Sequence, residues 1–376
     1  MKKIPFFKHN LGKEELCEIQ KVFHGSILTT GKQVERFEKQ FSKYLGCFDT
    51  VACTSWTGAA HIALLALGIR EGDEVILSPF TFVASATAII QAGAIPRFVD
   101  CEKETGNIDA KKIQKAINKK TKCIMPIHLY GQMCDMVAIH KIAKSHNLHI
   151  LEDAAHCIEG CRDGIRPGQL SDMACFSFFA TKNLACGEGG AVSFNDKKYS
   201  SVLRRLRLHG ITKTSADREK EGYKEWDMPA FGWKYNMDNI HAAILLAQLK
   251  KFNETKNLRK TKAKYYRQNL GGISNIKIFK EVKNSVHAWH LMVIQVPIIK
   301  RNAIIKILKE KKIFSTVNYR PIHKLTYFKN RYKQNFPNAE DLGRRVLSLP
   351  FYPKITKGQI NKVCKHLRNI MERKML

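Results

Sequence analysis

Acidic residues are scarce in the last third of this 376-residue sequence. Residues 251–376 hold 30 Lys and Arg but only 6 Asp and Glu, whereas residues 1–250 hold 34 and 27. The formal net charge of +31 therefore divides into +7 and +24. Such a basic chain suggests a nucleic-acid or membrane-surface partner, but no zinc-finger, RNA-recognition or helix-turn-helix signature accompanies the charge. A nucleic-acid-binding protein is kept only as a remote alternative.

Long hydrophobic runs and paired cysteines are also missing. The longest apolar stretch, residues 82–96, is too short to span a bilayer and contains Gln91. The N-terminal MKKIPFFKHNLGKEE lacks the apolar core of a secretory signal. The 11 cysteines are an odd number without a CxxC pair, which indicates neither a disulfide framework nor a zinc ribbon. We expect a soluble, cytoplasmic protein with reduced cysteines, no metal and no membrane partner.

Short apolar runs alternate with helical patterns between residues 49 and 200. Strands are expected at 50–55, 73–78, 95–100, 121–128 and 148–153, and helices at 57–68, 81–93, 109–119 and 134–147. Buried strands joined by helices predict an α/β fold with a mainly parallel sheet covered on both faces. Ligands of such sheets lie beyond the carboxyl ends of the strands.

The pattern changes after residue 250 to basic helices and short strands. A strand is expected at 287–296, helices at 302–312 and 357–375, and a connecting helix near 238–268. This organisation predicts a large domain, 1–250, and a smaller α+β domain, 251–376.

Three segments carry candidate chemistry. The strand end in ILEDAAH (150–156) places Asp153 at the mouth of the sheet, although Asp before Ala-Ala is also a good helix cap. In CFSFFATKNLACGEGGAVSF (175–194), Lys182 lies between apolar residues and a glycine-rich turn. Such a lysine forms Schiff bases when buried, and is otherwise a surface-loop residue. The strand-to-helix turn at Trp56 and Thr57 could bind a phosphate, as many such turns can.

One cofactor explains all three segments together. Pyridoxal 5'-phosphate (PLP) needs a helix N-terminus for its phosphate, a lysine for its aldehyde and a carboxylate for its ring nitrogen. Phe82, just after the strand 73–78, is then placed to stack on the ring, or is an ordinary core aromatic residue.

The sequence resembles the DegT/DnrJ/EryC1/StrS sugar aminotransferases, which are PLP enzymes of fold type I with a large, mainly parallel seven-stranded sheet domain. The resemblance covers nearly the whole chain, and the blocks occur in family order. Within the family, HAWHLMVI (287–294) and NYRPIH (318–323) look most like the UDP-4-amino-4-deoxy-L-arabinose–oxoglutarate aminotransferases of lipid A modification. The other matching blocks include ILTTGKQVERFEKQF (27–41), TSWTGAAHIALLALGIREGDEVI (54–76), FTFVASA (80–86), PIHLYGQ (126–132), ILEDAAH, FSFFATKNLACGEGGAV (176–192) and GWKYNMDNIHAAILLAQLKK (232–251).

The resemblance implies a role for each matching residue. Lys182 would form the Schiff base with the cofactor, Asp153 would pair with the pyridinium nitrogen, and His156 would lie near the ring edge. The other roles are stacking on the ring by Phe82, phosphate binding by Trp56, Thr57 and Ser177, completion of the phosphate site from a partner subunit by Asn236, and substrate binding by Thr30 and by a segment of the partner that holds Tyr319, Arg320 and His323.

Two departures from the family pattern stand out. Several relatives carry His at the position of Phe179, three residues before the lysine, so any acid–base or substrate-binding role is lost there. Trp56 stands where Ala is common and could narrow the cofactor entrance.

The implied activity is a PLP-dependent transamination from L-glutamate, which leaves as 2-oxoglutarate, to a nucleotide-linked keto sugar. A UDP-4-keto sugar for lipid A, O-antigen or another surface glycan is expected, with a dTDP-linked 3- or 4-keto-6-deoxyhexose as the alternative. The resemblance also implies a homodimer with shared active sites and no nucleic-acid partner. The basic C-terminal third is either a solvated surface or an attraction for the anionic nucleotide near Arg320.

Overall fold

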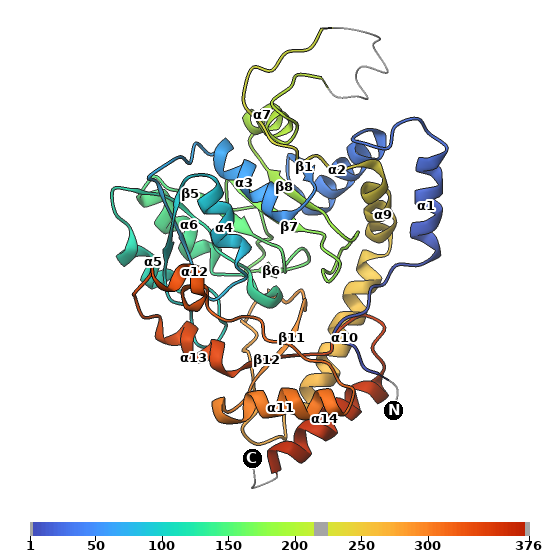
Figure 1. Ribbon diagram of the computed structural model, residues 1–376, viewed down its shortest axis with the longest axis vertical. Helices are drawn as coiled ribbons and strands as arrows, with labels where there is room; N and C mark the ends of the chain where they lie inside the picture. Colours follow the sequence, from blue (N-terminus) through green and yellow to red (C-terminus); the bar gives the residue numbers. More distant parts are fainter. Residues whose placement is uncertain (1–2, 214–224, 373–376) are drawn as a thin grey trace.

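A computed structural model describes residues 3–213 and 225–372, arranged around a seven-stranded sheet (Figure 1). The strand order is β1-β8-β7-β5-β4-β2-β3, and every neighbouring pair is parallel except those of β8, which runs antiparallel to both β1 and β7. The strands are β1 (Asp49–Cys53), β2 (Glu74–Leu77), β3 (Ile95–Phe98), β4 (Thr121–Ile124), β5 (His149–Asp153), β7 (Met173–Ser177) and β8 (Gly190–Phe194). This confirms the predicted α/β fold with a mainly parallel sheet.

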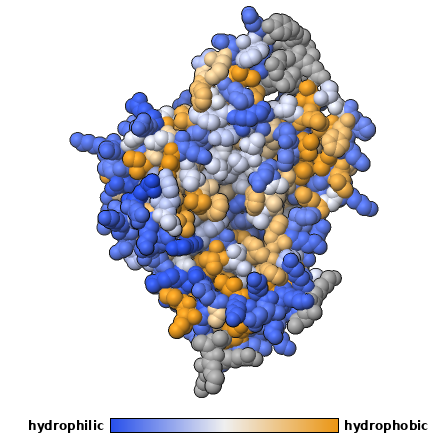
Figure 2. Space-filling model, in the orientation of Figure 1, coloured by the Kyte–Doolittle hydropathy of each residue, from blue (hydrophilic) through white to orange (hydrophobic). Residues whose placement is uncertain are grey.

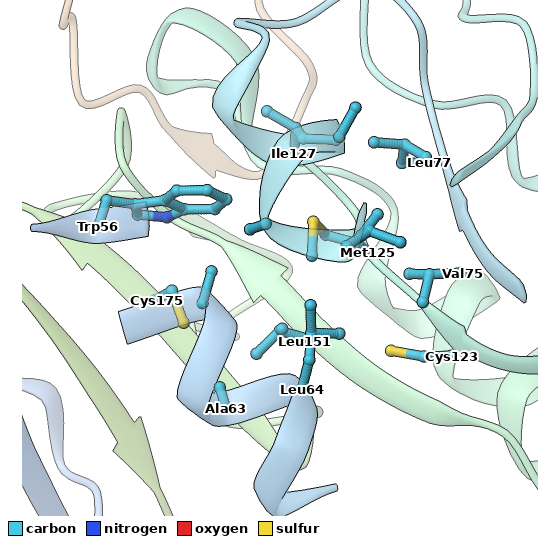
Figure 3. Close-up of a cluster of buried hydrophobic side chains, with 14 of the residues drawn as sticks. Trp56, Ala63, Leu64, Val75, Leu77, Cys123, Met125, Ile127, Leu151 and Cys175 are labelled. Atoms are coloured by element: carbon cyan, nitrogen blue, oxygen red, sulfur yellow. The ribbon is translucent and has the colours of Figure 1, made fainter. Parts of the chain in front are cut away.

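Helices cover both faces of the sheet because successive strand residues point to opposite sides. Val75 and Leu77 pack in one core with α3 and α4, whereas Ile76 packs in another with α5 and α6. Figure 3 shows part of the first core, in which α3 lies against the central strands. The helices of this part of the chain are α1 (Lys13–Phe23), α2 (Lys32–Leu45), α3 (Trp56–Ala66), α4 (Ala84–Gln91), α5 (Ala110–Ala116), α6 (Met136–Ser145) and α7 (Lys198–Leu206), with the 3-10 turn η1 (Leu129–Gly131).

A further hydrophobic core, separate from those on the two faces of the sheet, lies below the sheet in Figure 1 and joins the C-terminal elements. A three-stranded antiparallel sheet, ordered β12-β11-β9, packs there with α10, α11 and α14. The N-terminal segment joins this core, since Ile4 forms a β-bridge with Ile313. The elements are α9 (Asn239–Lys250), α10 (Phe252–Leu270), β9 (Lys277–Ile278), β11 (Met292–Gln295), α11 (Ile298–Glu310), η2 (Ile322–Lys324), α12 (Thr326–Lys329), α13 (Pro337–Arg345), β12 (Val346–Leu349) and α14 (Lys357–Glu372). The domain division at residue 250 stays a prediction.

Two expected elements differ from the structure. The single helix expected at 238–268 is two helices, α9 and α10, which meet at Lys251. The strand expected at 287–296 is shorter, because residues 288–290 pair with Tyr130 and Gly131 of η1 instead, and only Met292–Gln295 forms β11. A separate short strand, β10 (Ser285–Val286), pairs with β6 (Cys161–Arg162). Within the described ranges no helix is long and apolar enough to cross a membrane.

Candidate active site

Lys182 lies on the connection between β7 and β8, at the carboxyl edge of the parallel strands. Its backbone N–H donates to the Phe179 carbonyl at 2.8 Å, and the Gly187 φ of +102° allows the chain to turn back into β8. Burial lowers the pKa of Lys182 to about 8, with the charge of Asp153 acting in the opposite direction. Lys182 is half-buried, and its amine interacts electrostatically with Asp153, which is unlike a fully solvated loop lysine. Its role toward a cofactor stays a prediction.

Asp153 ends β5 and is 6% exposed. Its Oδ1 accepts the Ala155 backbone N–H at 3.1 Å, and its Oδ2 accepts the Ser85 hydroxyl at 2.9 Å. Burial raises the pKa of Asp153, while these two hydrogen bonds and the positive charge of Lys182 lower it. The carboxylate is therefore held in place by donors and not by the helix cap that the sequence also allowed, because the residues after it are not helical.

The N-terminus of α3 lies beside β8, one of the two strands that the Lys182 connection joins, and could supply hydrogen-bond donors to a ligand. Ser55 caps the helix by accepting the Gly58 N–H at 3.0 Å, and the indole N–H of Trp56 is buried without a hydrogen-bond partner in the described part of the chain. Gly190 of β8 pairs with Ser177 of β7 on one side and with Cys53, at the end of β1, on the other. Ser177 is therefore close to the turn that leads into α3. A helix N-terminus with a hydroxyl and an unpaired N–H nearby is suited to an anion.

His156 joins the site to the C-terminal segment. The Tyr130 backbone N–H donates to its Nδ1 at 3.2 Å, so the proton of the neutral ring is on Nε2, 3.2 Å from the Tyr319 hydroxyl. Burial and the charge of Lys182 lower the pKa of His156 well below its usual value. The ring of His290 stacks on His156 with centroids 4.3 Å apart.

Tyr319 contacts His156 of its own chain. The Ile322 N–H donates to the Pro79 carbonyl at 2.8 Å and anchors the segment to the loop after β2. The predicted approach of this segment to the substrate of a partner subunit stays a prediction. Phe82, which is 56% exposed, places its ring 5.8 Å from that of Tyr319. The stacking of Phe82 on a cofactor stays a prediction.

Arg320 and His323 lie on the far side of this segment. Arg320 is exposed and borders a cavity of about 470 Å³. His323 is 1% exposed and is engaged with Glu340 at 3.1 Å and with the ring of Phe336, so the structure does not bring it to Lys182. The physical reason is the 3-10 turn at 322–324, which directs His323 toward α13.

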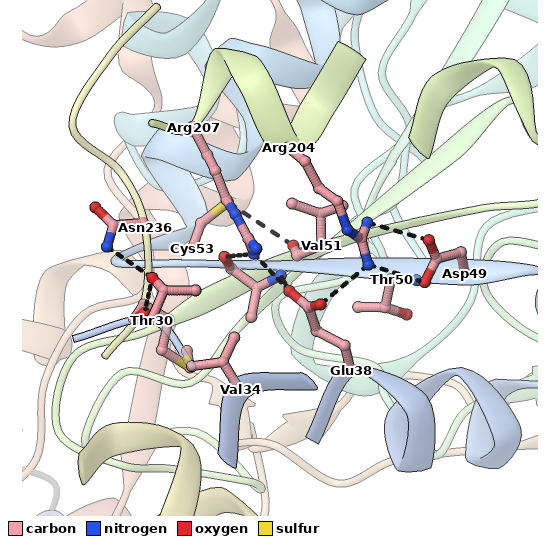
Figure 4. Close-up of polar contacts among 12 residues, drawn as sticks. Thr30, Val34, Glu38, Asp49, Thr50, Val51, Cys53, Arg204, Arg207 and Asn236 are labelled. Carbon is pink, nitrogen blue, oxygen red and sulfur yellow. Dashed lines mark hydrogen bonds and ion pairs between the residues drawn. The ribbon is translucent and has the colours of Figure 1, made fainter. Parts of the chain in front are cut away.

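Thr30 and Asn236 form a pair at the end of β1 (Figure 4). The Asn236 amide donates to the Thr30 hydroxyl at 2.7 Å, and that hydroxyl donates to the Met237 carbonyl at 2.7 Å. Asn236 also forms a β-bridge with Cys53 of the same chain, and its Oδ1 is buried without a partner in the described ranges. The proposed roles of Thr30 toward a substrate and of Asn236 toward a partner stay predictions.

Sequence reasoning did not single out several residues that the structure places in contact with the site. Ser85 lies in the matching block 80–86, and the sequence feature that could have pointed to it is a hydroxyl three residues after Phe82. Tyr130 and His290 lie in the matching blocks 126–132 and 287–294. Tyr130 contacts His156 from 26 residues away, and His290 contacts it from 134 residues away. Local patterns contain no signal for such a contact.

These residues fit PLP. Lys182 offers an amine of lowered pKa, Asp153 offers a fixed carboxylate, and the start of α3 offers a helix N-terminus with the unpaired indole N–H of Trp56 for a phosphate. Together with the α/β fold they define a PLP-dependent enzyme of fold type I.

The comparisons with known proteins identify the family. The model of the DegT/DnrJ/EryC1/StrS aminotransferase family matches residues 9–368, and the chain belongs to this family. It is a PLP-dependent transaminase.

Its relatives include the spore coat polysaccharide biosynthesis protein SpsC of Bacillus subtilis, 37% identical over 98% of this chain and 97% of SpsC. Among solved structures, Spr1654 of Streptococcus pneumoniae in its PMP form, described as a sugar aminotransferase, superposes with a TM-score of 0.93. It is 28% identical, over 98% of this chain and 99% of that one. S. venezuelae DesV in complex with a ketimine intermediate gives a TM-score of 0.92 at 30% identity, over 99% of this chain and 100% of that one.

Proposed function

We propose that the enzyme transfers an amino group from L-glutamate to a nucleotide-linked keto sugar, with a UDP-4-keto sugar as the favoured substrate. The product would serve lipid A, O-antigen or another surface glycan. The relatives support a glycan role, since SpsC is named for spore coat polysaccharide biosynthesis. A dTDP-linked 3- or 4-keto-6-deoxyhexose is the alternative substrate.

The observation that supports a nucleotide-linked substrate is a basic cavity bordered by Arg320, the residue after Tyr319. Arg301, Arg320, Lys324 and Arg344 border it, and Glu340 is the only acidic residue among its lining residues. Lys324 pairs with Glu340, which leaves a positive excess. Arg320, which borders this cavity, directly follows Tyr319, which contacts His156, so the cavity and the lysine site share one segment of the chain. In the proposal, the diphosphate binds the arginines and the sugar extends along this segment to Lys182.

Bound PLP would supply the aldehyde that accepts an amino group and the ring that withdraws electrons from the reacting carbon. The chain supplies proton transfer and orientation. With a pKa of about 8, the Lys182 amine is partly neutral near pH 7.5, and it can take a proton from the donor carbon and return one to the sugar carbon. Asp153, held by the Ser85 hydroxyl, would pair with the ring nitrogen, and His156 directs its Nε2 proton toward Tyr319.

A panel of UDP- and dTDP-linked keto sugars with glutamate as donor tests the proposal. We expect 2-oxoglutarate and an amino sugar nucleotide from a UDP-linked 4-keto sugar, measured by mass spectrometry. Turnover of dTDP-linked sugars alone would favour the alternative, and turnover of small keto acids alone would overturn the proposal. Arg320→Ala should raise KM for the nucleotide sugar about tenfold, whereas Arg331→Ala, which removes an exposed arginine over Tyr327, should not.

We also propose a homodimer with shared active sites. Exposed apolar side chains support it: Trp226, Met228 and Phe231 stand 47–69% exposed on one loop. Figure 2 shows another apolar area on the right of the molecule, over α1, where Leu16 and Phe23 are exposed. Scattered apolar residues are normal on a surface, but grouped ones mark interfaces.

Complementation distinguishes a shared site from a separate one. If Asn236 serves the partner's phosphate site, mixing inactive Lys182→Ala and Asn236→Ala chains creates one intact site in each mixed dimer, and activity returns. If Asn236 serves its own chain, as its bridge to Cys53 would allow, the mixture stays inactive. Light scattering of the unmixed protein gives the oligomeric state, and a monomer would overturn the dimer.

A further inference from the structure

Three buried polar side chains that the proposed chemistry does not use meet behind Lys182: Glu159, Asn183 and His290. Their exposed fractions are 2%, 7% and 3%. They come from three segments, namely the connection after β5, the residue next to Lys182, and the stretch between β10 and β11. Polar groups this deeply buried must be paired, so their partners define their role.

Asn183 connects all three segments. Its Nδ2 donates to both carboxylate oxygens of Glu159, at 3.0 and 3.1 Å, and to the Ala288 carbonyl at 2.8 Å. With both amide hydrogens used, its Oδ1 is an acceptor, and it lies 3.4 Å from His290 Nδ1. The amide therefore orients a neutral His290 with its proton on Nδ1.

His290 transmits this orientation to the site. Its ring stacks on His156 at 4.3 Å and 29°. Its backbone N–H donates to the Tyr130 carbonyl at 3.0 Å, and the Tyr130 N–H donates in turn to His156. The Tyr130 peptide groups therefore hold both His156 and His290, and Asn183 orients the ring of His290.

Arg259 of α10 fixes the other side of the cluster. Its Nη1 donates to the carbonyls of Trp289 and His290 at 3.2 and 3.3 Å, and the side chain is 2% exposed. Burial raises the pKa of Glu159 to about 7 and lowers that of Arg259 to about 10, and the charge of each opposes the shift of the other. Buried groups of opposite charge depend on each other, so removing one leaves the other uncompensated.

We propose that Asn183 is a positioning residue of the active site: it fastens the loop that carries Lys182 to Glu159 and to the Ala288 carbonyl, and through His290 it sets the ring of His156. Small displacements of reacting groups lower the rate strongly, because only errors well below 1 Å are compatible with a productive geometry. The proposal needs no assumption about the amino donor or the sugar.

The first test measures Lys182 in the full chain without cofactor. Acylation of Lys182 at a series of pH values, followed by mass spectrometry, gives the midpoint at which the amine becomes reactive, expected near 8. In Asn183→Ala the released loop admits water, and the midpoint should rise by about one unit or more toward that of a solvated lysine. The PLP dissociation constant, measured by absorbance after dialysis, should rise about tenfold in the same variant.

A second variant separates the two halves of the proposal. His290→Leu removes the ring that supports His156 but leaves Asn183 bonded to Glu159. It should raise the PLP dissociation constant about tenfold while leaving the Lys182 midpoint within about half a unit of wild type. Asn118→Ala is the control, since it removes another amide–carboxylate pair, with Glu74 at 2.8 Å, from the opposite edge of the sheet.

Two results would overturn the proposal. One is a folded Asn183→Ala chain in which the pH midpoint of Lys182 acylation and the PLP affinity are those of the wild type. The other is an Asn118→Ala chain that shows the same changes as Asn183→Ala. If Asn183→Ala does not fold, wild-type PLP affinity in His290→Leu overturns it. A failed substrate panel would leave both measurements unaffected, so the two proposals can fail separately.

Discussion

At the scale of single residues, Lys182 and Asp153 show how burial makes ordinary side chains reactive. Taking the amine out of water lowers its pKa to about 8, and the nearby carboxylate stops it from falling further. Both residues were singled out from the sequence, because a single cofactor explains the lysine, the carboxylate and the helix start together, although each segment alone has an ordinary structural explanation. Ser85, Tyr130 and His290, which hold the site residues in place, have no local signature.

Lys182→Ala should abolish covalent attachment of PLP. Without the amine no Schiff base to the chain forms, and turnover should fall by about 10²–10⁴-fold or more because the proton carrier is also lost. Intact mass after borohydride reduction checks the attachment. Lys115→Ala, on an exposed turn of α5, should behave as wild type. A retained cofactor link in Lys182→Ala would place the Schiff base on another lysine.

Lys182→Met should stabilise the cofactor-free protein. The folded pKa of Lys182 lies below its usual 10.5, so stability is lost as pH falls from about 10.5 to 8 and stays reduced below that. At pH 7 the variant should gain on the order of 1–3 kcal/mol in the free energy of unfolding. Denaturant unfolding at pH 7 and pH 10 measures this, and a gain that does not shrink at pH 10 contradicts it.

Ser85→Ala should shift the acid limb of activity upward. The Ser85 hydroxyl lowers the pKa of Asp153, so its loss raises that pKa further and the carboxylate is protonated at a higher pH. The pH profile of kcat/KM reports the change. Thr87→Ala, which removes a hydroxyl that donates to the Ala84 carbonyl of its own helix, is the control. An unchanged acid limb would mean that Asp153 does not govern it.

At the scale of elements, the start of α3 depends on a glycine in β8. A Cβ on Gly190 would lie 2.3–2.4 Å from backbone atoms of Ser55 and Trp56, so the strand and the helix start can approach only without a side chain there. This close approach places the α3 N-terminus beside Ser177, on the strand that leads to Lys182.

Gly190→Ala should therefore destabilise the fold and weaken PLP binding. Displaced backbone costs about 1–3 kcal/mol, since a Cβ against main chain cannot be relieved by a rotamer change. Thermal unfolding and PLP affinity check this together. Gly272→Ala is the matched control, because its Cβ would meet open space. Equal melting temperatures for the two variants would contradict the close-approach argument.

Most elements of the large domain followed from local pattern, and the exceptions have tertiary causes. The stretch 287–296 has strand composition throughout, yet its first residues leave the small sheet to pair with Tyr130 and Gly131. The helical pattern of residues 238–268 is continuous in the sequence, but the structure interrupts it at Lys251, between α9 and α10. His323, which was expected to bind the substrate, contacts Glu340 in the structure because of the turn after Pro321, and its role toward a substrate stays a prediction.

At the scale of the whole molecule, the uneven charge acquires a location. Most of the excess of basic over acidic residues belongs to the C-terminal third, which contributes Arg301, Arg320, Lys324 and Arg344 to one cavity. Figure 2 shows hydrophilic side chains over much of the lower left of the visible face, on the side of α12 and α13.

KM for a nucleotide-linked substrate should rise with ionic strength. A diphosphate drawn by exposed cations is screened once the Debye length falls to about 8 Å near 0.15 M salt. Initial rates between 20 and 300 mM salt, with kcat as the internal control, measure the effect on the order of several-fold. A salt-independent KM would assign the charge to a solvated surface.

The sequence by itself determined the alternation that builds the sheet, the lysine, the carboxylate and the helix start, because these depend on neighbours along the chain. Only the tertiary structure decided that Tyr319 meets His156 of its own chain, that Ser85 bonds Asp153, and that Asn183 ties the lysine loop to His290. Those contacts join segments 68 to 163 residues apart. Packing of the folded chain, and not local preference, brings such segments together.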